Sequence, residues 1–267
     1  MRRWKRIGAR AWLVVFLVAF APAAGAAAEK NLLPGIGADD RRVPVESTAW
    51  PWSAIGRLNT STGRHCTATL IARDAVVTAA HCVHDPRTAR LVRPSTLHFV
   101  AGYQRGSYVA HAVGRSIKVA APARPQAVAG IDRVARDWAI VVLDPPLAIR
   151  PIPVLSGDGG MQAVPPGSLL RAGYSQDRPH QLAVHDGCRI KDRLAQGRVW
   201  LTDCDATRGD SGSPVLIRRD TTVDLVGITA AVVDAGSPTG GPTGTLVIPA
   251  VAFAAALASR TPEASQR

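Results

Sequence analysis

One serine of the chain, Ser211, stands in surroundings that suit chemistry. It lies in the run Gly209-Asp210-Ser211-Gly212. Glycine permits tight backbone turns that expose a neighbouring side chain and direct backbone N–H groups toward one point. A serine that attacks a carbonyl group needs such donors where negative charge develops on the carbonyl oxygen. Gly, Asp and Ser also form ordinary surface turns, so the run gains meaning only together with other residues.

A base and an acid of suitable kinds lie upstream in two separate segments. His81 follows the run Val77-Thr-Ala-Ala and precedes Cys82, and Asp137 precedes an apolar run over residues 138–143. A serine hydroxyl is a weak nucleophile near neutral pH and needs a base within hydrogen-bond reach. An imidazole exchanges protons in that range of pH, and a carboxylate can hold its second ring nitrogen. The three segments together therefore favour nucleophilic catalysis.

These segments resemble those of the chymotrypsin/trypsin-like serine proteases. The shared features are Thr78-Ala-Ala-His-Cys82, an aspartate before an apolar run, and Gly209-Asp-Ser-Gly212. The order His, Asp, Ser along the chain is also that of the family, whereas other triad folds use other orders. The resemblance extends from about residue 42 to about residue 259, and the glutamyl-endopeptidase-like branch of bacterial secreted enzymes is one possibility within it.

The resemblance implies a role for each residue of the site. His81, Asp137 and Ser211 would be the catalytic residues, and the backbone N–H groups of Gly209 and Ser211 would form the oxyanion hole. No cofactor or metal ion is expected, and the expected partner is a protein or peptide substrate bound by a monomer.

The pattern of the whole chain predicts a mostly β protein. Twenty prolines and 24 glycines separate short runs rich in Val, Ile and Thr, which is typical of many short strands. The family resemblance implies two antiparallel six-stranded β-barrels, with the site in the cleft between them, and a C-terminal helix. We expect strands at 53–58, 65–71, 75–78, 96–101, 108–120 and 139–143, then 169–173, 182–186, 199–203, 214–217, 223–233 and 243–248, and the helix at 251–259.

The first 28 residues read as a secretory signal peptide. Five basic residues precede an apolar run over residues 11–20, and small residues with Ala-x-Ala cleavage sites follow. This order is typical of signal peptides, and the apolar run is shorter than the roughly 20 residues of a membrane span. We expect export to the periplasm or the medium, and no membrane association after cleavage.

Residues 29–42 form either a pro-segment or an N-terminal arm. Cleavage after Arg42 would free the amino group of Val43, which the family resemblance would pair with Asp210. The sequence Val-Pro-Val differs from the usual family N-terminus, so both possibilities stay open. Residues 43–146 would then carry His81 and Asp137 in the first barrel, residues 147–260 would carry the nucleophile in the second, and 261–267 would be a tail.

The four cysteines predict two disulfides in an exported protein, and four cysteines allow three pairings. The family resemblance implies a Cys66–Cys82 bridge that closes the histidine loop, which leaves Cys188 to pair with Cys204. A zinc site that uses Cys82 with nearby histidines is disfavoured, because the chain lacks a Cys-x-x-Cys motif or a partner cluster.

Charge argues against nucleic-acid binding. The chain carries a formal net charge of +12, and its first 28 residues hold five of the 32 basic residues. The remaining basic residues form no Lys/Arg block and do not alternate with aromatic residues, as they do in many nucleic-acid-binding segments. A solvated surface accounts for such a diffuse excess.

Substrate preference rests on the loop before the nucleophile. Asp205 lies six residues before Ser211, where trypsin-like enzymes carry the acid that receives Lys or Arg side chains. Cys204 is spaced differently from the cysteine of the animal enzymes, so the pocket loop differs. Arg208 lies next to the oxyanion hole, where it either binds an acidic group or is simply solvated.

The segment Thr229-Ala230-Ala231-Val232 is expected to pair with the substrate backbone as an added strand. Val232 would narrow the mouth of the pocket. Thr229 stands where glutamate-specific relatives carry a histidine, which argues against a preference for glutamate.

These observations predict an exported serine endopeptidase that works through an acyl-enzyme. Two alternatives remain at this point: a non-catalytic binding module on the same fold, and an esterase-like hydrolase with weak peptidase activity.

Overall fold

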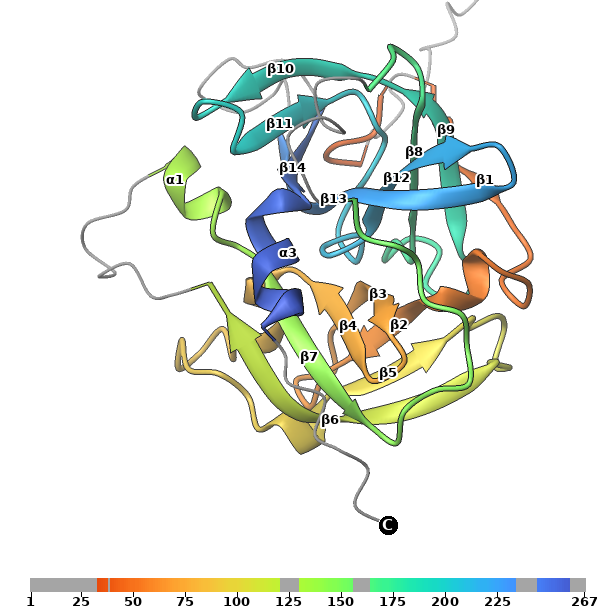
Figure 1. Cartoon of the computed structure of the whole chain (residues 1–267), viewed down its shortest axis with the longest axis vertical. Coiled ribbons are helices and arrows are strands. Elements are labelled where there is room, and N and C mark those ends of the chain that lie inside the picture. Colours follow the sequence, from red (N-terminus) through yellow and green to blue (C-terminus); the bar gives the residue numbers. More distant parts are fainter. Residues whose placement is uncertain (1–32, 38, 121–129, 156–163, 234–243, 260–267) are drawn as a thin grey trace, which may run out of the picture. The chain divides into compact units, whose positions relative to one another are not determined.

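The structure is a computed structural model that describes residues 33–37, 39–120, 130–155, 164–233 and 244–259. Within these ranges β-strands dominate and the helices are short (Figure 1). The proposed signal peptide, residues 29–32 and the tail lie outside the described residues. In the part of the chain that is described, no helix is both long enough and apolar enough to cross a membrane.

The first half of the chain forms a closed antiparallel barrel in the order β2-β3-β4-β7-β6-β5. Short apolar and β-branched runs, such as Ala-Val-Val-Thr in β4, are buried along their whole length and suit a strand in a closed sheet. The strands are β2 (Ile55–Asn59), β3 (His65–Ala72), β4 (Ala75–Thr78), β5 (His98–Ala101), β6 (Ala110–Val119) and β7 (Ala139–Asp144).

Three one-turn 3₁₀ helices and one short α-helix join or flank these strands. They are η1 (Trp52–Ala54), η2 (Ala80–Val83), η3 (Pro94–Thr96) and α1 (Ile131–Val134). Of these, η2 has the most bearing on function, because it follows β4 directly and carries His81.

The second half forms an eight-stranded antiparallel sheet in the order β1-β9-β8-β12-β13-β14-β11-β10. We expected six strands closed into a second barrel; within the described residues the sheet keeps two edges, at β1 and β10. Its strands are β1 (Val43–Pro44), β8 (Leu169–Gly173), β9 (Ala183–Cys188), β10 (Ile190–Leu194), β11 (Val199–Thr202), β12 (Pro214–Arg219), β13 (Thr222–Val233) and β14 (Gly244–Pro249).

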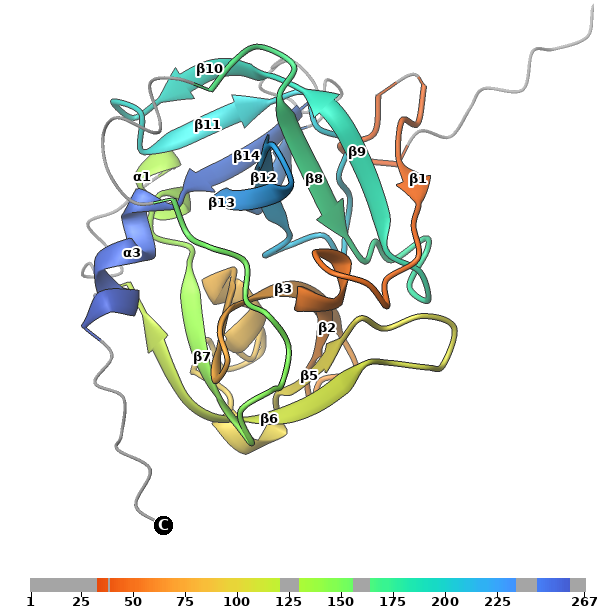
Figure 2. The same cartoon turned by 45° about the vertical axis from the view of Figure 1, so that its right-hand side comes forward.

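The two additional strands are those with the weakest sequence signal. β10 reads Ile-Lys-Asp-Arg-Leu and is largely exposed, so it has no apolar face to reveal it. β1 is two residues long and pairs Val43 with Val184 of β9, which Figure 2 shows beside it. The twelve predicted strands are all present, and their ends differ from the structure by at most two residues, which is ordinary for strand boundaries.

A large hydrophobic core holds buried residues from both halves of the chain, among them Phe99 and Leu225. Helix α3 (Val251–Ala258) lies beside β7 in both views (Figures 1 and 2). Its Phe253 is buried against Trp138, with ring centroids 6.3 Å apart. Full burial of a phenylalanine contributes roughly 2–3 kcal/mol, so the helix of the second half is anchored on the barrel of the first.

Candidate active site

His81 and Asp137 are brought together by the pairing of β4 with β7. Thr78 pairs with Ala139, so the turn after β4 and the residues before β7 lie at the same end of the barrel. Asp137 Oδ2 lies 2.7 Å from His81 Nδ1, and Oδ1 accepts a hydrogen bond of 2.8 Å from the backbone N–H of His81. The carboxylate therefore fixes both the backbone and the ring of His81.

This contact determines the tautomer of the ring. A carboxylate can only accept hydrogen bonds, so Nδ1 carries the proton that points to Asp137. In the neutral ring Nε2 is then left with its lone pair. The side chains of His81 and Asp137 are 42% and 21% exposed, so this basic nitrogen is accessible to a bound molecule.

Ser211 lies on a loop that is tied to the first barrel. Thr67 of β3 donates its N–H to Ser211 O (3.0 Å) and its hydroxyl to Gly209 O (3.1 Å). Gly209 and Gly212 have φ angles of +91° and +80°, a region that glycine adopts without strain. A side chain at Gly212 would overlap Thr78 Oγ1 and Thr67 O. Glycine is thus required there for the loop to reach the barrel.

His81 and Ser211 line one cleft of about 540 Å³. Among the described residues, neither Ser211 Oγ nor His81 Nε2 has a hydrogen-bond partner, and the amides of Gly209 and Ser211 are likewise without one. Catalytic hydrogen bonds are often long without substrate and tighten when it binds. The full lining is Gly63, Arg64, His65, Cys66, His81, Gln176, Arg208, Gly209 and Ser211.

Several lining residues gave no clear sequence signal. His65 lies half-buried at the start of β3, and its Nε2–H donates to Tyr174 O at 3.0 Å. Burial lowers its pKa, and the nearby Arg57 lowers it further. Gln176 donates its backbone N–H to Arg208 O at 2.6 Å. The segment after β8 thus contacts β3 through Tyr174 and the nucleophile loop through Gln176, and a sequence pattern does not reveal either tertiary contact.

Asp210, next to Ser211, is fully buried together with Arg171 of β8. Arg171 Nη1 lies 2.5 Å from Asp210 Oδ1, and both side chains are 0% exposed. The other carboxylate oxygen accepts hydrogen bonds from Ser175 Oγ (2.7 Å) and from the backbone N–H of Thr207 (2.8 Å). None of the Arg171 N–H groups makes an aligned hydrogen bond within the described residues, so the pair is held by charge. Asp210 thus already has a cationic partner while residues 39–42 remain attached.

Asp205 does not lie in the cleft. Its side chain points to the N-terminal arm, where Oδ1 accepts from Gly37 N and Oδ2 accepts from Arg41 N, both at 2.9 Å. His185 Nδ1 accepts the backbone N–H of Asp205 at 2.7 Å. Burial lowers the pKa of His185, although the charge of Asp205 opposes this shift. The carboxylate of Asp205 therefore anchors the arm and is not part of the cleft lining. A role for Asp205 in binding Lys or Arg side chains of a substrate stays a prediction that these contacts do not favour.

The segment Thr229–Val232 belongs to β13. Thr229 is buried and exchanges two backbone hydrogen bonds with the nucleophile loop, from Gly212 N to Thr229 O and from Thr229 N to Ser213 O. Its hydroxyl accepts a bond of 2.9 Å from Ser213 Oγ. Thr229 therefore holds the nucleophile loop, whereas Ala230 is buried in the hydrophobic core. A bulge between Thr229 and Ala231 changes the register of the strand.

The arm also reaches Val232, which was expected to narrow a substrate pocket. Gly35 O accepts a hydrogen bond from Ala206 N at 3.2 Å, and a side chain at Gly35 would overlap Ala206 O and Val232. The backbone of the arm is thus in contact with both segments that the sequence assigns to substrate binding. Arg208, the remaining predicted substrate-binding residue, is exposed and lines the cleft beside Ser211.

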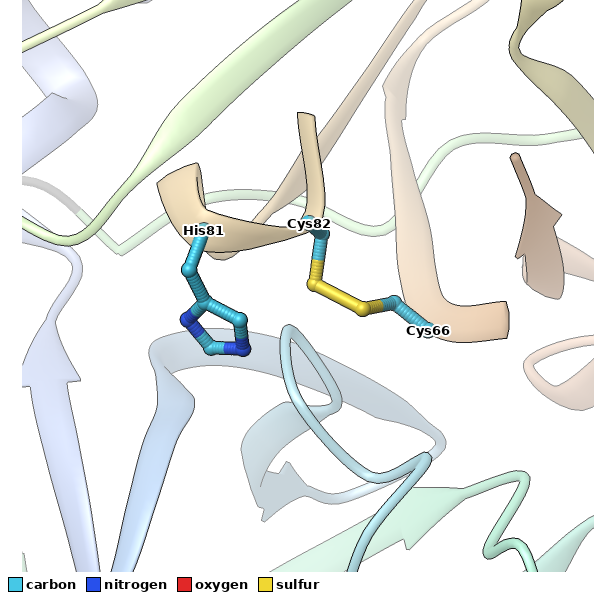
Figure 3. A group of neighbouring side chains, drawn as sticks. All are labelled: Cys66, His81 and Cys82. Carbon is cyan, nitrogen blue, oxygen red and sulfur yellow. A yellow bond between two sulfur atoms is a disulfide. The ribbon is translucent and has the colours of Figure 1, made fainter. Parts of the chain in front are cut away.

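Both disulfides are present. Cys66 is bonded to Cys82 and Cys188 to Cys204, and Figure 3 shows the first bridge beside His81. The sulfur atoms of this bridge and a ring nitrogen of His81 lie within 4.8 Å of one another, a spacing that could hold a metal ion. Zinc binds cysteine as the thiolate, and both sulfur atoms are used in the disulfide. The Cys66–Cys82 bridge is therefore a structural link between β3 and η2 rather than part of a metal site.

Comparison with known families and sequences places the chain among serine proteases. A family model described as Trypsin matches residues 41–252. Serine protease 23 of Rattus norvegicus is 29% identical over 188 residues, which cover 63% of this chain and 46% of the relative. Glutamyl endopeptidase of Bacillus licheniformis is 36% identical over 62 residues, which cover 23% of this chain and 19% of the relative. The chain thus matches about half or less of the length of these curated relatives.

The fold is also similar to a solved structure described as Glu endopeptidase in complex with MPD. The TM-score is 0.63 at 20% identity, and the match covers 84% of this chain and 98% of the other. At this level of identity the similarity concerns the fold alone.

Proposed function

Because this chain belongs to the trypsin family of serine proteases, we propose that it is an exported serine endopeptidase. In this proposal His81, Asp137 and Ser211 hydrolyse peptide bonds through an acyl-enzyme. The observation that carries the proposal is the double hydrogen bond from His81 to Asp137, which leaves Nε2 as a free base in the cleft that Ser211 also lines.

The chemistry follows the general serine-protease scheme. His81 Nε2 takes the hydroxyl proton as Ser211 Oγ bonds to the carbonyl carbon, and the backbone N–H groups of Gly209 and Ser211 donate to the resulting oxyanion. His81 then gives the proton to the leaving amine, which departs and leaves an ester on Ser211. A water molecule, deprotonated by His81, then attacks the ester carbon. The bond from that carbon to Ser211 Oγ breaks, His81 returns the proton to Ser211 Oγ, and the acid product leaves. The negative charge of Asp137 stabilises the imidazolium that forms in each half of the cycle.

The positive charge of the cleft favours substrates with neutral or acidic residues near the bond that is cleaved. Arg64 and Arg208 line it, and no acidic residue is among the described lining residues. A Lys or Arg side chain would meet like charge there, whereas a carboxylate could pair with either arginine. With Asp205 directed to the arm, this arrangement argues against a trypsin-like preference for basic residues.

Export is part of the same proposal. It rests on the N-terminal sequence, and the two disulfides agree with it, because disulfides persist mainly in oxidising compartments.

The test is digestion of a peptide library by the purified protein, with Ser211→Ala as the matched control and mass spectrometry as the readout. We expect cuts that the variant does not make, with acidic or neutral residues near them but without a preference for glutamate directly before the cut. Covalent labelling by a serine-reactive phosphonate gives a second measurement. A protein that neither cuts nor becomes labelled would be a binding module, and turnover of esters without peptides would favour the esterase-like alternative.

A further inference from the structure

We propose that Arg42 of the N-terminal arm is a positioning residue for the Ser211 loop. It acts through Ser175 and Asp177, so the arm over residues 39–42 is a permanent part of the site. This inference rests on the proposed function, and it predicts that cleavage after Arg42 lowers activity.

The Arg42 guanidinium is buried, with its side chain only 1% exposed. Nη1 donates to Ser175 Oγ (2.8 Å) and to Asp177 Oδ1 (3.0 Å), and Nη2 donates to Asp177 Oδ2 (2.9 Å). Two parallel hydrogen bonds to one carboxylate need the flat fork of arginine, which lysine lacks. The segment that follows β8 is therefore held in one place by Arg42.

A second carboxylate completes the shell of the guanidinium. Arg42 Nε and Nη2 donate to the two oxygens of Asp40 at 2.9 and 3.0 Å, and Arg178 also pairs with Asp40. The hydrogen bond from Arg42 outweighs burial and lowers the pKa of Asp40 to about 2. Burial alone would lower the pKa of Arg42, but its bonds to Asp40 and Asp177 raise it instead. The buried cation is thus fully paired.

The segment fixed by Arg42 contacts the nucleophile loop directly. Ser175 Oγ donates its single proton to Asp210 Oδ2 (2.7 Å), so its oxygen is left to accept from Arg42. The next residue, Gln176, donates its N–H to Arg208 O. The positions of Arg208 and Asp210 therefore depend on Ser175 and Gln176. Since Gly209 and Ser211 flank Asp210, the two amides of the proposed oxyanion hole depend on the same support.

The bond after Arg42 is poorly placed for processing. Arg42 O accepts a hydrogen bond of 2.9 Å from Arg178 Nη1, and Val43 is paired with Val184 in the sheet. A new amino group at Val43 would also find Asp210 already paired with Arg171. Both observations favour an arm that stays attached.

The first test compares Arg42→Ala, Ser175→Ala and the double variant in cleavage of one peptide substrate. Arg218 pairs with Asp186 on the surface, so Arg218→Ala is the control for loss of one positive charge. We expect Arg42→Ala to lower kcat about 10- to 100-fold with KM within about twofold, because oxyanion stabilisation acts in the transition state. The effects of substitutions in one hydrogen-bond network are not additive, so the kcat of the double variant should be close to that of Arg42→Ala alone. Additive losses, or a loss seen only in KM, would overturn the proposal.

The second test asks whether the guanidinium itself restores function. Added methylguanidinium should recover part of the kcat of Arg42→Ala and leave Arg218→Ala unchanged, whereas Arg42→Lys should stay impaired because it lacks the fork. No recovery by methylguanidinium in a variant that melts like the wild type would count against the mechanism.

The third test is independent of catalysis. Amide hydrogen exchange over residues 207–213 should be faster in Arg42→Ala than in wild type, and unchanged in Ser211→Ala. Unchanged exchange in Arg42→Ala would disprove the positioning role even if the protein proved to cut no peptide. A chain that begins at Val43 should show the same fast exchange and reduced kcat; a gain of activity on that truncation would establish the processing alternative.

Discussion

Two pairs of this molecule each join an aspartate to a basic side chain, but one pair is exposed to solvent and the other is buried. His81 and Asp137 are 42% and 21% exposed beside the cleft, whereas Arg171 and Asp210 are both completely buried beneath the nucleophile loop. The exposed pair is held by two aligned hydrogen bonds; the buried pair is held by charge, with Asp210 completed by Ser175 and Thr207. Reactivity requires access to solvent and substrate, whereas fixing the loop requires rigidity.

The difference predicts how each pair responds to damage. An exposed pair is screened by water and contributes little to stability. In a buried pair, the attraction between the two charges offsets the loss of their hydration. Removal of one partner leaves the other charge buried and uncompensated, which strongly destabilises the fold. Disruption of the exposed pair should therefore lower activity with little loss of stability, whereas disruption of the buried pair should lower the free energy of unfolding.

The largest effect is expected from Asp137→Asn. The amide would favour the wrong tautomer of His81, and kcat/KM for a peptide substrate should fall by about 10⁴-fold. The free energy of unfolding, measured in urea, should change by less than about 1 kcal/mol. Activity within tenfold of the wild type would show that Asp137 does not orient the base.

Arg171→Met should produce the opposite profile. Asp210 would remain buried without its cation, and the free energy of unfolding should fall by about 3–5 kcal/mol. The double variant Arg171→Met/Asp210→Asn removes both charges and should recover part of this loss in the same urea experiment. A single variant that loses less than about 1 kcal/mol would contradict the comparison.

The smallest effect is expected at Asp40, whose partner Arg42 is buried while its own side chain is 29% exposed. Its pKa is lowered to about 2, so its contribution is present above its usual pKa of about 4 and is lost as the pH falls toward 2. Asp40→Asn should reduce the free energy of unfolding by on the order of 1–2 kcal/mol at pH 6. Urea titrations should show this difference shrink between pH 4 and 2; a difference independent of pH would exclude the ionised carboxylate as its cause.

The sequence was a good guide to the fold and to the pairing of His81 with Asp137, because both depend on patterns within short segments. The positive φ angles of Gly209 and Gly212 and the apolar runs of β4 and β7 are properties of short segments, so the sequence pattern indicates them. The exposed strand β10 was missed because its Lys-Asp-Arg centre has no apolar face. A second closed barrel was expected on resemblance alone, and within the described residues the sheet has two free edges.

Partners of buried charges could not be predicted in the same way. Asp205 occupies the position of a specificity acid along the chain, yet its direction is set by Gly37 and Arg41, more than 160 residues away. Arg171 and Arg42 look like ordinary basic residues in the sequence. Only tertiary contacts decide that such a side chain is buried, because an unpaired charge would be excluded from the interior.

The close approach at Gly212 has a consequence for sequence variation. Even a single methyl group there would overlap Thr78 Oγ1 and Thr67 O, and the φ of +80° adds strain for any other residue. In a library that samples every amino acid at each position, the serine and its neighbours would differ in kind: variants of Ser211 should fold and lack activity, whereas variants of Gly212 should be depleted by misfolding. Selection for expression alone would thus retain Gly212 but would not distinguish Ser211 from other residues at that position.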